Sequence, residues 1–582
     1  MTSRAGGTGP ASSRMPIVIT MIESPDPSRN AGPSVPAPEA GAPESIAATS
    51  LEKPAGRRYH PSPEDWRAEI FYSIVTDRFQ ATEPIAAEGD RADGTSRHGG
   101  DLRGLTSRLG YVHDLGATTV QLSPVALNGS GAYHGYAPVH FMAVDPRLGE
   151  LAELRRLVDT AHRLGLRVVL DLVLNHAGPV FDYADGSNAW KGTREAADVA
   201  ANGIAVLPIE LASPQHFSRR GVIDDWEDTD QETQGDFPPD YRRLATENPR
   251  TRELLQYIAC WWIKETDIDG VRLDAIRHMD RTFIQDLSSA VKNYARSLGK
   301  SNFAVIGEHA SSDDTLIASC FESGVSAMYN YGEYRRQNRA LHGCGPARLL
   351  EHSFEIAAKA FGGDHGSTVR FIDNHDLYRF LRDGEPLERL RVGLAFVLFS
   401  LGIPMLYYGT ERGFRQASGR LDPENLADPA DPGNREDMFA AGKFVSASSA
   451  GDGFDRSSPA FGWTRRLIEI RRRHAALRFG EQEVVFSDPG GPGIYAFVRR
   501  HREGSALVVL NTADRARRLD LSALDLSTDV EPGGPLVDIL DPGLPAPVGG
   551  PGDGPLRMTV PPFGVSVLMQ DPEHLKPRPG SQ

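Results

Sequence analysis

The order of apolar and polar positions along the chain alternates between short apolar runs and longer amphipathic stretches. Residues 68–79, 116–124 and 166–176 are apolar runs of strand length, and several end in polar or charged residues. Between them, residues 102–115 and 151–164 repeat apolar side chains with helical spacing. Strands and helices in this alternation predict parallel βαβ units, whose strands are apolar because both of their faces are buried.

The same alternation continues to about residue 410. Five further strands are predicted, at residues 271–274, 303–308, 325–330, 369–375 and 404–409. Eight such units are the number in a TIM (β/α)8 barrel, where residues at the carboxyl ends of the strands form the active site. We therefore predict an α/β protein built on this barrel, with its functional residues at one end.

Two segments depart from the barrel pattern. The polar stretch at residues 177–249 is too long for an ordinary loop, and we predict an inserted subdomain after the third strand, called the B domain below. Residues 476–572 contain short strands separated by turn signals, which predicts an antiparallel β-sandwich. The barrel is then expected at residues 61–176 and 250–475.

Composition adds predictions for the two ends and for the location. Residues 1–60 are rich in Pro, Ala, Gly and Ser and lack periodic apolar positions, so we expect them to be disordered, like the polar tail 573–582. No secretion signal is recognisable, and no apolar run has the length of a membrane span. These features predict a cytoplasmic protein that does not enter a membrane.

Charge and cysteine content exclude some classes of function. The chain has 78 acidic and 63 basic residues and a net charge of -15, which argues against a nucleic-acid-binding surface and suits a neutral substrate. Cys260, Cys320 and Cys344 form no CxxC pair, so a zinc site or a redox dithiol is not expected. We expect reduced thiols and no organic cofactor.

Three carboxylates end three of the predicted strands. They are Asp274, Glu308 and Asp376, and neither metal-ligand spacing nor a glycine-rich phosphate loop accompanies them. Cleavage of a glycosidic bond requires two carboxyl groups, one to attack or stabilise the sugar and one to protonate the leaving oxygen. Glu308 follows an apolar strand, and such surroundings favour the protonated form that a general acid needs.

Arg272 precedes Asp274 by two positions, so both side chains point to the same side of the strand. The guanidinium group favours the charged carboxylate that a nucleophile needs. A purely structural ion pair would have the same pattern. His176 and His375 can hydrogen-bond sugar hydroxyl groups, and Tyr136 can stack on a sugar ring.

These residues resemble the α-amylase family, a large group of glycoside hydrolases with a (β/α)8 barrel. Four stretches resemble the conserved regions of the family, namely Asp171–His176, Gly270–His278, Gly307–Glu308 and Phe371–Asp376. Supporting matches lie at residues 116–124, 133–136 and 402–411. All of them occur in the order of the family, between about residue 66 and residue 440.

The resemblance implies a role for each carboxylate. Asp274 would be the nucleophile, Glu308 the general acid/base and Asp376 the third carboxylate, which positions the sugar. The outcome would be retention through a covalent glucosyl-enzyme, with the nucleophile and the acid about 5 to 5.5 Å apart. Asp171 would be a structural carboxylate near Arg272.

The resemblance also implies a substrate-binding set. Arg272, His176, His375 and Tyr136 would line the subsite of the attacked glucose. Arg277 and His278 match positions at the acceptor side or the domain interface, although a solvated charge after the strand is an alternative.

A calcium ion is the one cofactor that the resemblance suggests. It would bridge the barrel and the B domain through Asn175, although the expected partner motif is disrupted in Phe237–Arg243. The alternative is that Asn175 only makes hydrogen bonds at the end of the strand.

The leading hypothesis is therefore a retaining hydrolase of α-1,4-glucosidic bonds in α-glucans or maltooligosaccharides. The alternative is a transglycosylase with the same carboxylates, which passes the sugar to another glucan. A non-catalytic glucan-binding or partner subunit is the third hypothesis, and the presence of all three carboxylates disfavours it. The expected partner is the glucan itself, and the oligomeric state is open.

Overall fold

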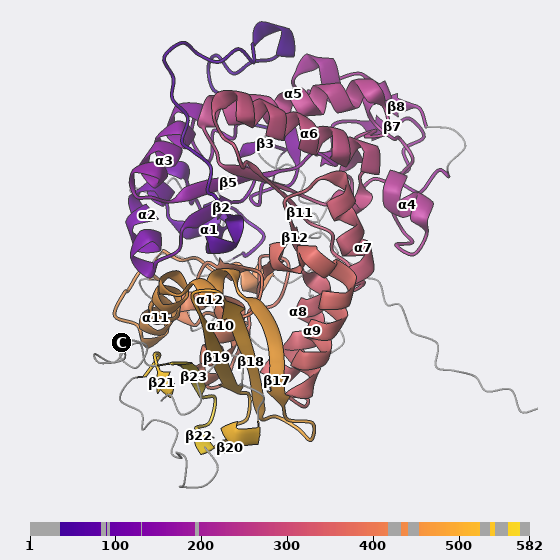
Figure 1. Cartoon of the computed structure of the whole chain (residues 1–582). Coiled ribbons are helices and arrows are strands. Elements are labelled where there is room, and N and C mark those ends of the chain that lie inside the picture. Colours follow the sequence, from indigo (N-terminus) through magenta and orange to yellow (C-terminus); the bar gives the residue numbers. More distant parts are fainter. Residues whose placement is uncertain are drawn as a thin grey trace, which may run out of the picture.

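The computed structural model describes nine stretches of the chain: residues 35–82, 89, 93–129, 131–192, 197–416, 432–439, 453–523, 536–541 and 557–570. Eight parallel strands close into a barrel near the centre of the molecule (Figure 1). In order around the barrel they are β1 (Phe71–Ile74), β2 (Thr119–Leu122), β5 (Arg167–Leu172), β10 (Gly270–Leu273), β11 (Ala304–Gly307), β12 (Ala327–Tyr329), β13 (Thr368–Arg370) and β15 (Ile403–Tyr407). This arrangement confirms the predicted barrel.

Helices surround the barrel strands (Figure 1). They are α1 (Thr76–Phe79), α2 (Leu102–Leu115), α3 (Leu151–Arg163), α5 (Pro249–Thr266), α6 (Arg281–Leu298), α7 (Asp314–Ser319), α8 (Tyr331–Leu341), α9 (Arg348–Phe361), α10 (Leu387–Phe399), α11 (Pro459–Arg473) and α12 (Ala475–Phe479). Local sequence sets their ends. The α6 helix, for example, begins where Asp280 accepts the backbone N–H of Phe283, and ends at Gly299, whose φ is 103°.

Most barrel strands are shorter in the structure than in the sequence analysis, and two of them illustrate this. The run at residues 68–79 forms a strand only as far as Ile74 and continues as helix α1, in which buried Asp77 accepts the backbone N–H groups of His98 (2.9 Å) and Gly99 (3.1 Å). The run at residues 166–176 leaves the barrel after Leu172. Sequence alone does not show these exits, because the apolar character continues past them.

The B-domain segment contains short elements at one side of the barrel (Figure 1). Strand β6 (His176–Ala177) pairs with β9 (Arg242–Arg243), and β7 (Asp182–Tyr183) pairs with β8 (Val199–Ala200). Helix α4 (Thr229–Gln234) completes the segment. Because β6 directly follows β5, the B domain begins at the carboxyl end of a barrel strand.

The C-terminal region is antiparallel, as predicted. Its larger sheet contains β17 (Glu481–Ser487), β18 (Ile494–His501), β19 (Gly504–Asn511), β23 (Val565–Gln570) and β21 (Leu536–Asp538), and its smaller sheet contains β20 (Arg517–Asp520) and β22 (Arg557–Val560). Ile494, Ala496 and Val498 of β18 pack with Leu519 and Val560 of the smaller sheet. The alternate residues of β18 face the barrel helices, so this strand is buried on both faces.

The described chain begins beside the barrel, which differs from the disorder expected for residues 1–60. Glu44 accepts the backbone N–H of Ile209 (2.8 Å), and Ser45 donates to Glu210 (2.6 Å). The hydroxyl of Thr49 lies 2.7 Å from that of Tyr257 in α5. Isolated apolar side chains of this segment, such as Ile46 and Leu51, also pack against the core. The sequence did not reveal these contacts, because they are too scattered to form a periodic pattern. Residues 1–34 and the tail 573–582 lie outside the described residues.

Two smaller expectations concern thiols and membranes. Cys260, Cys320 and Cys344 are all free, and the first two are buried. Within the described ranges, no helix has both the length and the apolar character that crossing a membrane requires.

One buried histidine gives a pH-dependent contribution to stability. His140 of β4 (Pro138–Val144) is 1% exposed, its Nδ1 accepts the N–H of Met142, and its buried Nε2 has no hydrogen-bond partner. Burial lowers the pKa of His140 from 6.5 to about 4. The unfolded chain therefore binds this proton first, and the fold loses stability as the pH falls from 6.5 to 4.

We predict that His140→Gln removes this loss. The unfolding free energy of the wild type, relative to the variant, should fall by about 3 kcal/mol between pH 7.5 and pH 4. Urea denaturation of both proteins across this range measures the difference. A difference that does not change with pH would contradict the assignment.

Candidate active site

Arg272 lies at the centre of a group of carboxylates at the carboxyl end of the barrel strands. Its side chain is 1% exposed, and its Nη1 contacts Asp171 of β5 and Asp274, the latter at 3.1 Å. Its Nη2 lies 2.6 Å from Oε2 of Glu308, which follows β11. The barrel register pairs Arg272 with Asp171 and Ile306, so one guanidinium group connects three neighbouring strands.

Asp274 has one engaged and one free oxygen. Its Oδ1 contacts Arg272, whereas its Oδ2 is buried without a hydrogen-bond partner. Burial raises the pKa of Asp274 well above its usual value, and the charges of Glu308 and Asp171 add to this, while Arg272 opposes it. The expectation that Arg272 keeps Asp274 charged therefore describes only one part of the balance.

The backbone turns sharply after Asp274. Ala275 has a φ of 53°, which places it in the left-handed region that non-glycine residues seldom adopt. The N–H of Ala275 points to Oε2 of Glu308 (3.3 Å), and the N–H of Ile276 binds the carbonyl oxygen of Glu308 (3.0 Å). This turn holds the segment Gly270–His278 against Glu308.

Both carboxyl oxygens of Glu308 are held. Oε2 faces Arg272 and the N–H of Ala275, and Oε1 accepts a hydrogen bond from the hydroxyl of Tyr331 (2.7 Å). Tyr331 begins α8, and its hydroxyl also accepts the Nδ2–H of Asn374 (3.1 Å). Sequence analysis missed Tyr331, although its position directly after the sixth predicted strand was a usable signal.

Asp376 is the most exposed of the three predicted carboxylates. Its side chain is 17% exposed, against 4% for Asp274 and 6% for Glu308. Its Oδ2 lies 3.1 Å from Nε2 of His375, and its Oδ1 lies 3.4 Å from Nη2 of Arg435. Burial also raises the pKa of Asp376.

Arg435 is a second residue that sequence analysis missed. It is buried, and besides Asp376 it contacts the carbonyl oxygen of His375 through Nε (2.8 Å) and the hydroxyl of Tyr133 through Nη1 (3.1 Å). It lies in residues 432–439, far along the chain after the eighth strand, and no local pattern marks it.

Tyr136 connects Asp171 to His375, the neighbour of Asp376. Its hydroxyl lies 2.9 Å from Oδ2 of Asp171 and 2.8 Å from Nε2 of His375. The rings of Tyr136 and His375 are nearly parallel, with 5.4 Å between their centres. Burial and the charge of Arg272 hold the pKa of His375 well below its usual value, so this imidazole is neutral.

His176 occupies a position behind Tyr136. It is fully buried, its Nε2 lies 2.9 Å from the carbonyl oxygen of Tyr136, and its ring stacks on Tyr241. Burial lowers the pKa of His176 to about 4. In this conformation it supports Tyr136 from behind, whereas sequence analysis expected a direct contact with sugar.

Arg277 and His278 both face the B domain. Arg277 forms an ion pair with Glu232 of α4 and donates to the carbonyl oxygen of Ala310 (3.0 Å). Nδ1 of His278 lies 2.8 Å from the carbonyl oxygen of Glu232. These contacts agree with the domain-interface alternative and not with a solvated charge. A contact with the acceptor sugar stays a prediction.

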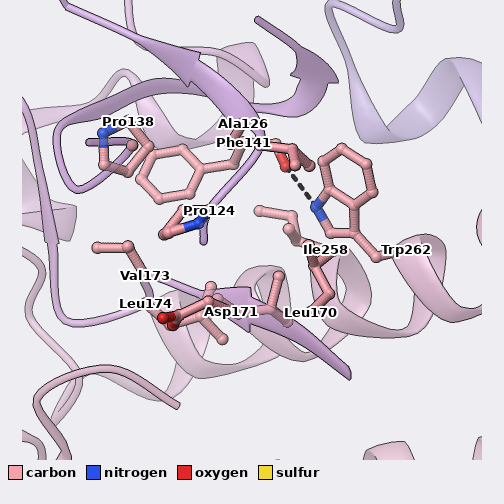
Figure 2. Close-up of a pocket in the computed structure, with 13 residues that line it drawn as sticks. Pro124, Ala126, Pro138, Phe141, Leu170, Asp171, Val173, Leu174, Ile258 and Trp262 are labelled. Carbon is pink, nitrogen blue, oxygen red and sulfur yellow. Dashed lines mark hydrogen bonds between the residues drawn. The ribbon is translucent and has the colours of Figure 1, made fainter. Parts of the chain in front are cut away.

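An apolar pocket lies on the outer side of β5, next to Asp171. Figure 2 shows Ile258 and Trp262 of α5 on one side of it, with the Trp262 indole donating to the carbonyl oxygen of Phe141 (2.9 Å), and Asp171 on the other side. The carboxylate of Asp171 itself faces Arg272 and the Tyr136 hydroxyl. Burial raises the pKa of Asp171 to about 7, although the charge of Arg272 opposes this rise.

Comparison with known proteins identifies the family. A family model described as "Alpha amylase, catalytic domain" matches residues 73–468, which is more than half of the chain. The chain belongs to the α-amylase family. The match includes the barrel and all three predicted carboxylates.

Curated relatives within the α-amylase family differ in activity. Neopullulanase 2 of Thermoactinomyces vulgaris is 28% identical, over 77% of this chain and 70% of that protein. The α-amylase of Streptomyces lividans is 28% identical over 70% of this chain, and the β/α-amylase of Paenibacillus polymyxa is 27% identical over 77%. This chain spans only half and about a third of the length of these two relatives, respectively.

Solved structures of the family have the same architecture. The α-amylase of Geobacillus thermoleovorans, which was crystallised with acarbose, is 26% identical with a TM-score of 0.69, over 88% of this chain and 99% of that one. A cyclomaltodextrin glucanotransferase with three domains is 23% identical, with a TM-score of 0.67, over 86% and 99% of the two chains. The second likeness concerns the fold alone.

The residues around Asn175 do not make a good calcium site. Calcium takes six to eight oxygen ligands, and here Asn175 Oδ1 and Asp240 Oδ1 are buried without hydrogen-bond partners. Two buried arginines engage several other oxygens of this segment. Arg243 binds Ser218, Thr246 and the carbonyl oxygen of His278, and Arg242 binds Asp236. These guanidinium groups already supply the positive charge that a cation would bring.

The described residues contain one other cluster of possible metal ligands, His60, His162 and Asp269, and it is poorly suited to a metal. The two imidazole rings are stacked at 4.0 Å, so their in-plane lone pairs do not converge on one point. Lys300 lies 3.0 Å from Asp269 and neutralises it.

We predict that the fold does not depend on calcium. Dialysis against EGTA should leave the melting temperature unchanged, because Arg242 and Arg243 join the barrel to the B domain. Arg243→Met should lower the melting temperature equally with EGTA and with millimolar calcium. A loss on chelation that calcium restores would contradict this prediction.

Proposed function

We propose that this protein cleaves α-1,4-glucosidic bonds in α-glucans or maltooligosaccharides with retention of configuration. The observation that carries the proposal is the arrangement around Arg272, where Asp274 and Glu308 contact the two terminal nitrogens of one guanidinium group. Two carboxyl groups held so close suit a retaining mechanism better than an inverting one, which needs room for a water molecule between them.

The roles follow from the hydrogen bonds. Asp274 attacks the anomeric carbon with Oδ2, the oxygen that receives no hydrogen bond from the described residues. Glu308 protonates the leaving oxygen and then removes a proton from the water that hydrolyses the glucosyl-enzyme. Asp376, the most exposed of the three, accepts hydrogen bonds from the sugar hydroxyl groups.

The surrounding residues orient the sugar and the carboxylates. Neutral His375 and the Tyr136 hydroxyl line the same wall as Asp376. Arg435 holds Asp376 from the other side. The proposed substrate agrees with the activities for which relatives are named, among them α-amylases and a neopullulanase.

Transfer to a second glucan is the alternative outcome for the same glucosyl-enzyme. A cyclomaltodextrin glucanotransferase of Geobacillus stearothermophilus is 26% identical over 77% of this chain. Such enzymes differ from hydrolases in whether water or a sugar hydroxyl reaches the intermediate. The carboxylates are common to both.

We predict that Asp274→Asn and Glu308→Gln each lower kcat on maltoheptaose by at least about a thousandfold, while the proteins stay folded. Each change removes a chemical role and hardly alters the volume of the side chain. Asp159→Asn, on the exposed face of α3, is the matched control and should retain full activity. Wild-type turnover in either active-site variant would overturn the assignment.

Product analysis separates the two reactions. We expect maltoheptaose to yield only shorter maltooligosaccharides, with the newly formed reducing ends in the α configuration by NMR. Products longer than maltoheptaose would establish transfer in place of hydrolysis. The β configuration at early times would exclude retention.

A further inference from the structure

Tyr331 is the one side chain that contacts Oε1 of Glu308 among the described hydrogen bonds. Its hydroxyl lies 2.7 Å from this oxygen and is fully enclosed by protein. Burial, followed by the charge of Glu308, raises the pKa of Tyr331 well above its usual value. The hydroxyl therefore keeps its proton over the whole working range of pH.

The direction of the hydrogen bond is set by Asn374. Its Nδ2–H donates to the Tyr331 hydroxyl at 3.1 Å, and its Oδ1 accepts the backbone N–H of Asp376 at 2.8 Å. An amide nitrogen can only donate, so the Tyr331 oxygen accepts there and its own proton is directed to Glu308. Asn374 thereby joins the loop of the third carboxylate to the side chain that holds Glu308.

The other oxygen of Glu308 is unsuited to carry a proton. Oε2 lies 2.6 Å from Arg272 Nη2 and 3.3 Å from the N–H of Ala275, and both of these groups are donors. A proton on Oε2 would face their hydrogens. Oε1 receives one donor and keeps a second lone-pair direction, so it is the oxygen that can hold the transferable proton.

We propose that Tyr331 is the positioning residue of the general acid/base: it holds Oε1 of Glu308 so that the second lone pair of this oxygen faces the bond to be cleaved. The proton moves from Oε1 to the leaving glycosidic oxygen as the bond to the anomeric carbon breaks. It returns to Oε1 from water as water attacks the intermediate. This proposal rests on the role of Glu308 proposed above.

The variant Tyr331→Phe tests the proposal, because it removes the hydroxyl and keeps the ring that packs on Phe371. We expect kcat on maltoheptaose to fall by about tenfold, which corresponds to ~1.4 kcal/mol. The alkaline limb of the rate profile should move to higher pH, because the variant lacks the donor that favours the ionised carboxylate. Tyr334→Phe, the same change one turn later in α8, is the matched control and should show neither effect.

A second substrate separates positioning of the acid from general damage to the site. An aryl maltooligosaccharide with a nitrophenol leaving group needs little protonation, so Tyr331→Phe should slow its cleavage much less than that of maltoheptaose. Equal losses on both substrates, or an unchanged alkaline limb, would overturn the proposal. A melting temperature close to that of the wild type shows that the variant is folded.

The test of Tyr331 can fail without the proposed function failing. Wild-type cleavage of maltoheptaose that Glu308→Gln abolishes supports the function, whatever Tyr331→Phe does. If the wild type cleaves no glucan, the proposed function fails, and the proposal for Tyr331 fails with it. If the wild type is active and the Tyr331→Phe profile equals that of Tyr334→Phe, only the role of Tyr331 is wrong.

Discussion

The rest of the site depends on one buried guanidinium group, whose positive charge must be paired with nearby carboxylates. Arg272 is almost inaccessible to water, and an isolated buried charge is too costly to persist unless it is paired. Asp171, Asp274 and Glu308 all face its terminal nitrogens and supply the negative charge that pairs with it. The same contacts that stabilise the arginine therefore bring together side chains from three barrel strands.

This dependence also explains why the site is asymmetric. Asp274 and Glu308 come from strands that adjoin in the barrel, and the parallel register fixes them against Arg272. Asp376 comes from the chain after β13, on the other side of the barrel mouth, and is held by His375 and Arg435. The rigid pair suits bond cleavage, and the more exposed carboxylate suits recognition of a substrate that must enter and leave.

Sequence predicts those parts of this protein that local pattern encodes. Eight apolar runs identified the barrel, and the spacing of Arg272 and Asp274 placed them correctly on one side of a strand. Tyr331 and Arg435 were missed because their roles depend on distances across the fold. His176 was predicted as a sugar contact, but its burial between Tyr136 and Tyr241 of the B domain also depends on such distances and was not predicted. The segment 35–60 was misjudged because composition cannot show contacts, polar or apolar, with another part of the chain.

The C-terminal sheet has a consequence for how the molecule comes apart. Its β18 strand contributes Tyr495 and Phe497 to the core of the barrel and Ile494 and Ala496 to the core of the sandwich. Separating the two regions would expose a large apolar face on each, so neither can melt while the other stays native. We therefore expect the barrel and the sandwich to unfold together as a single cooperative unit.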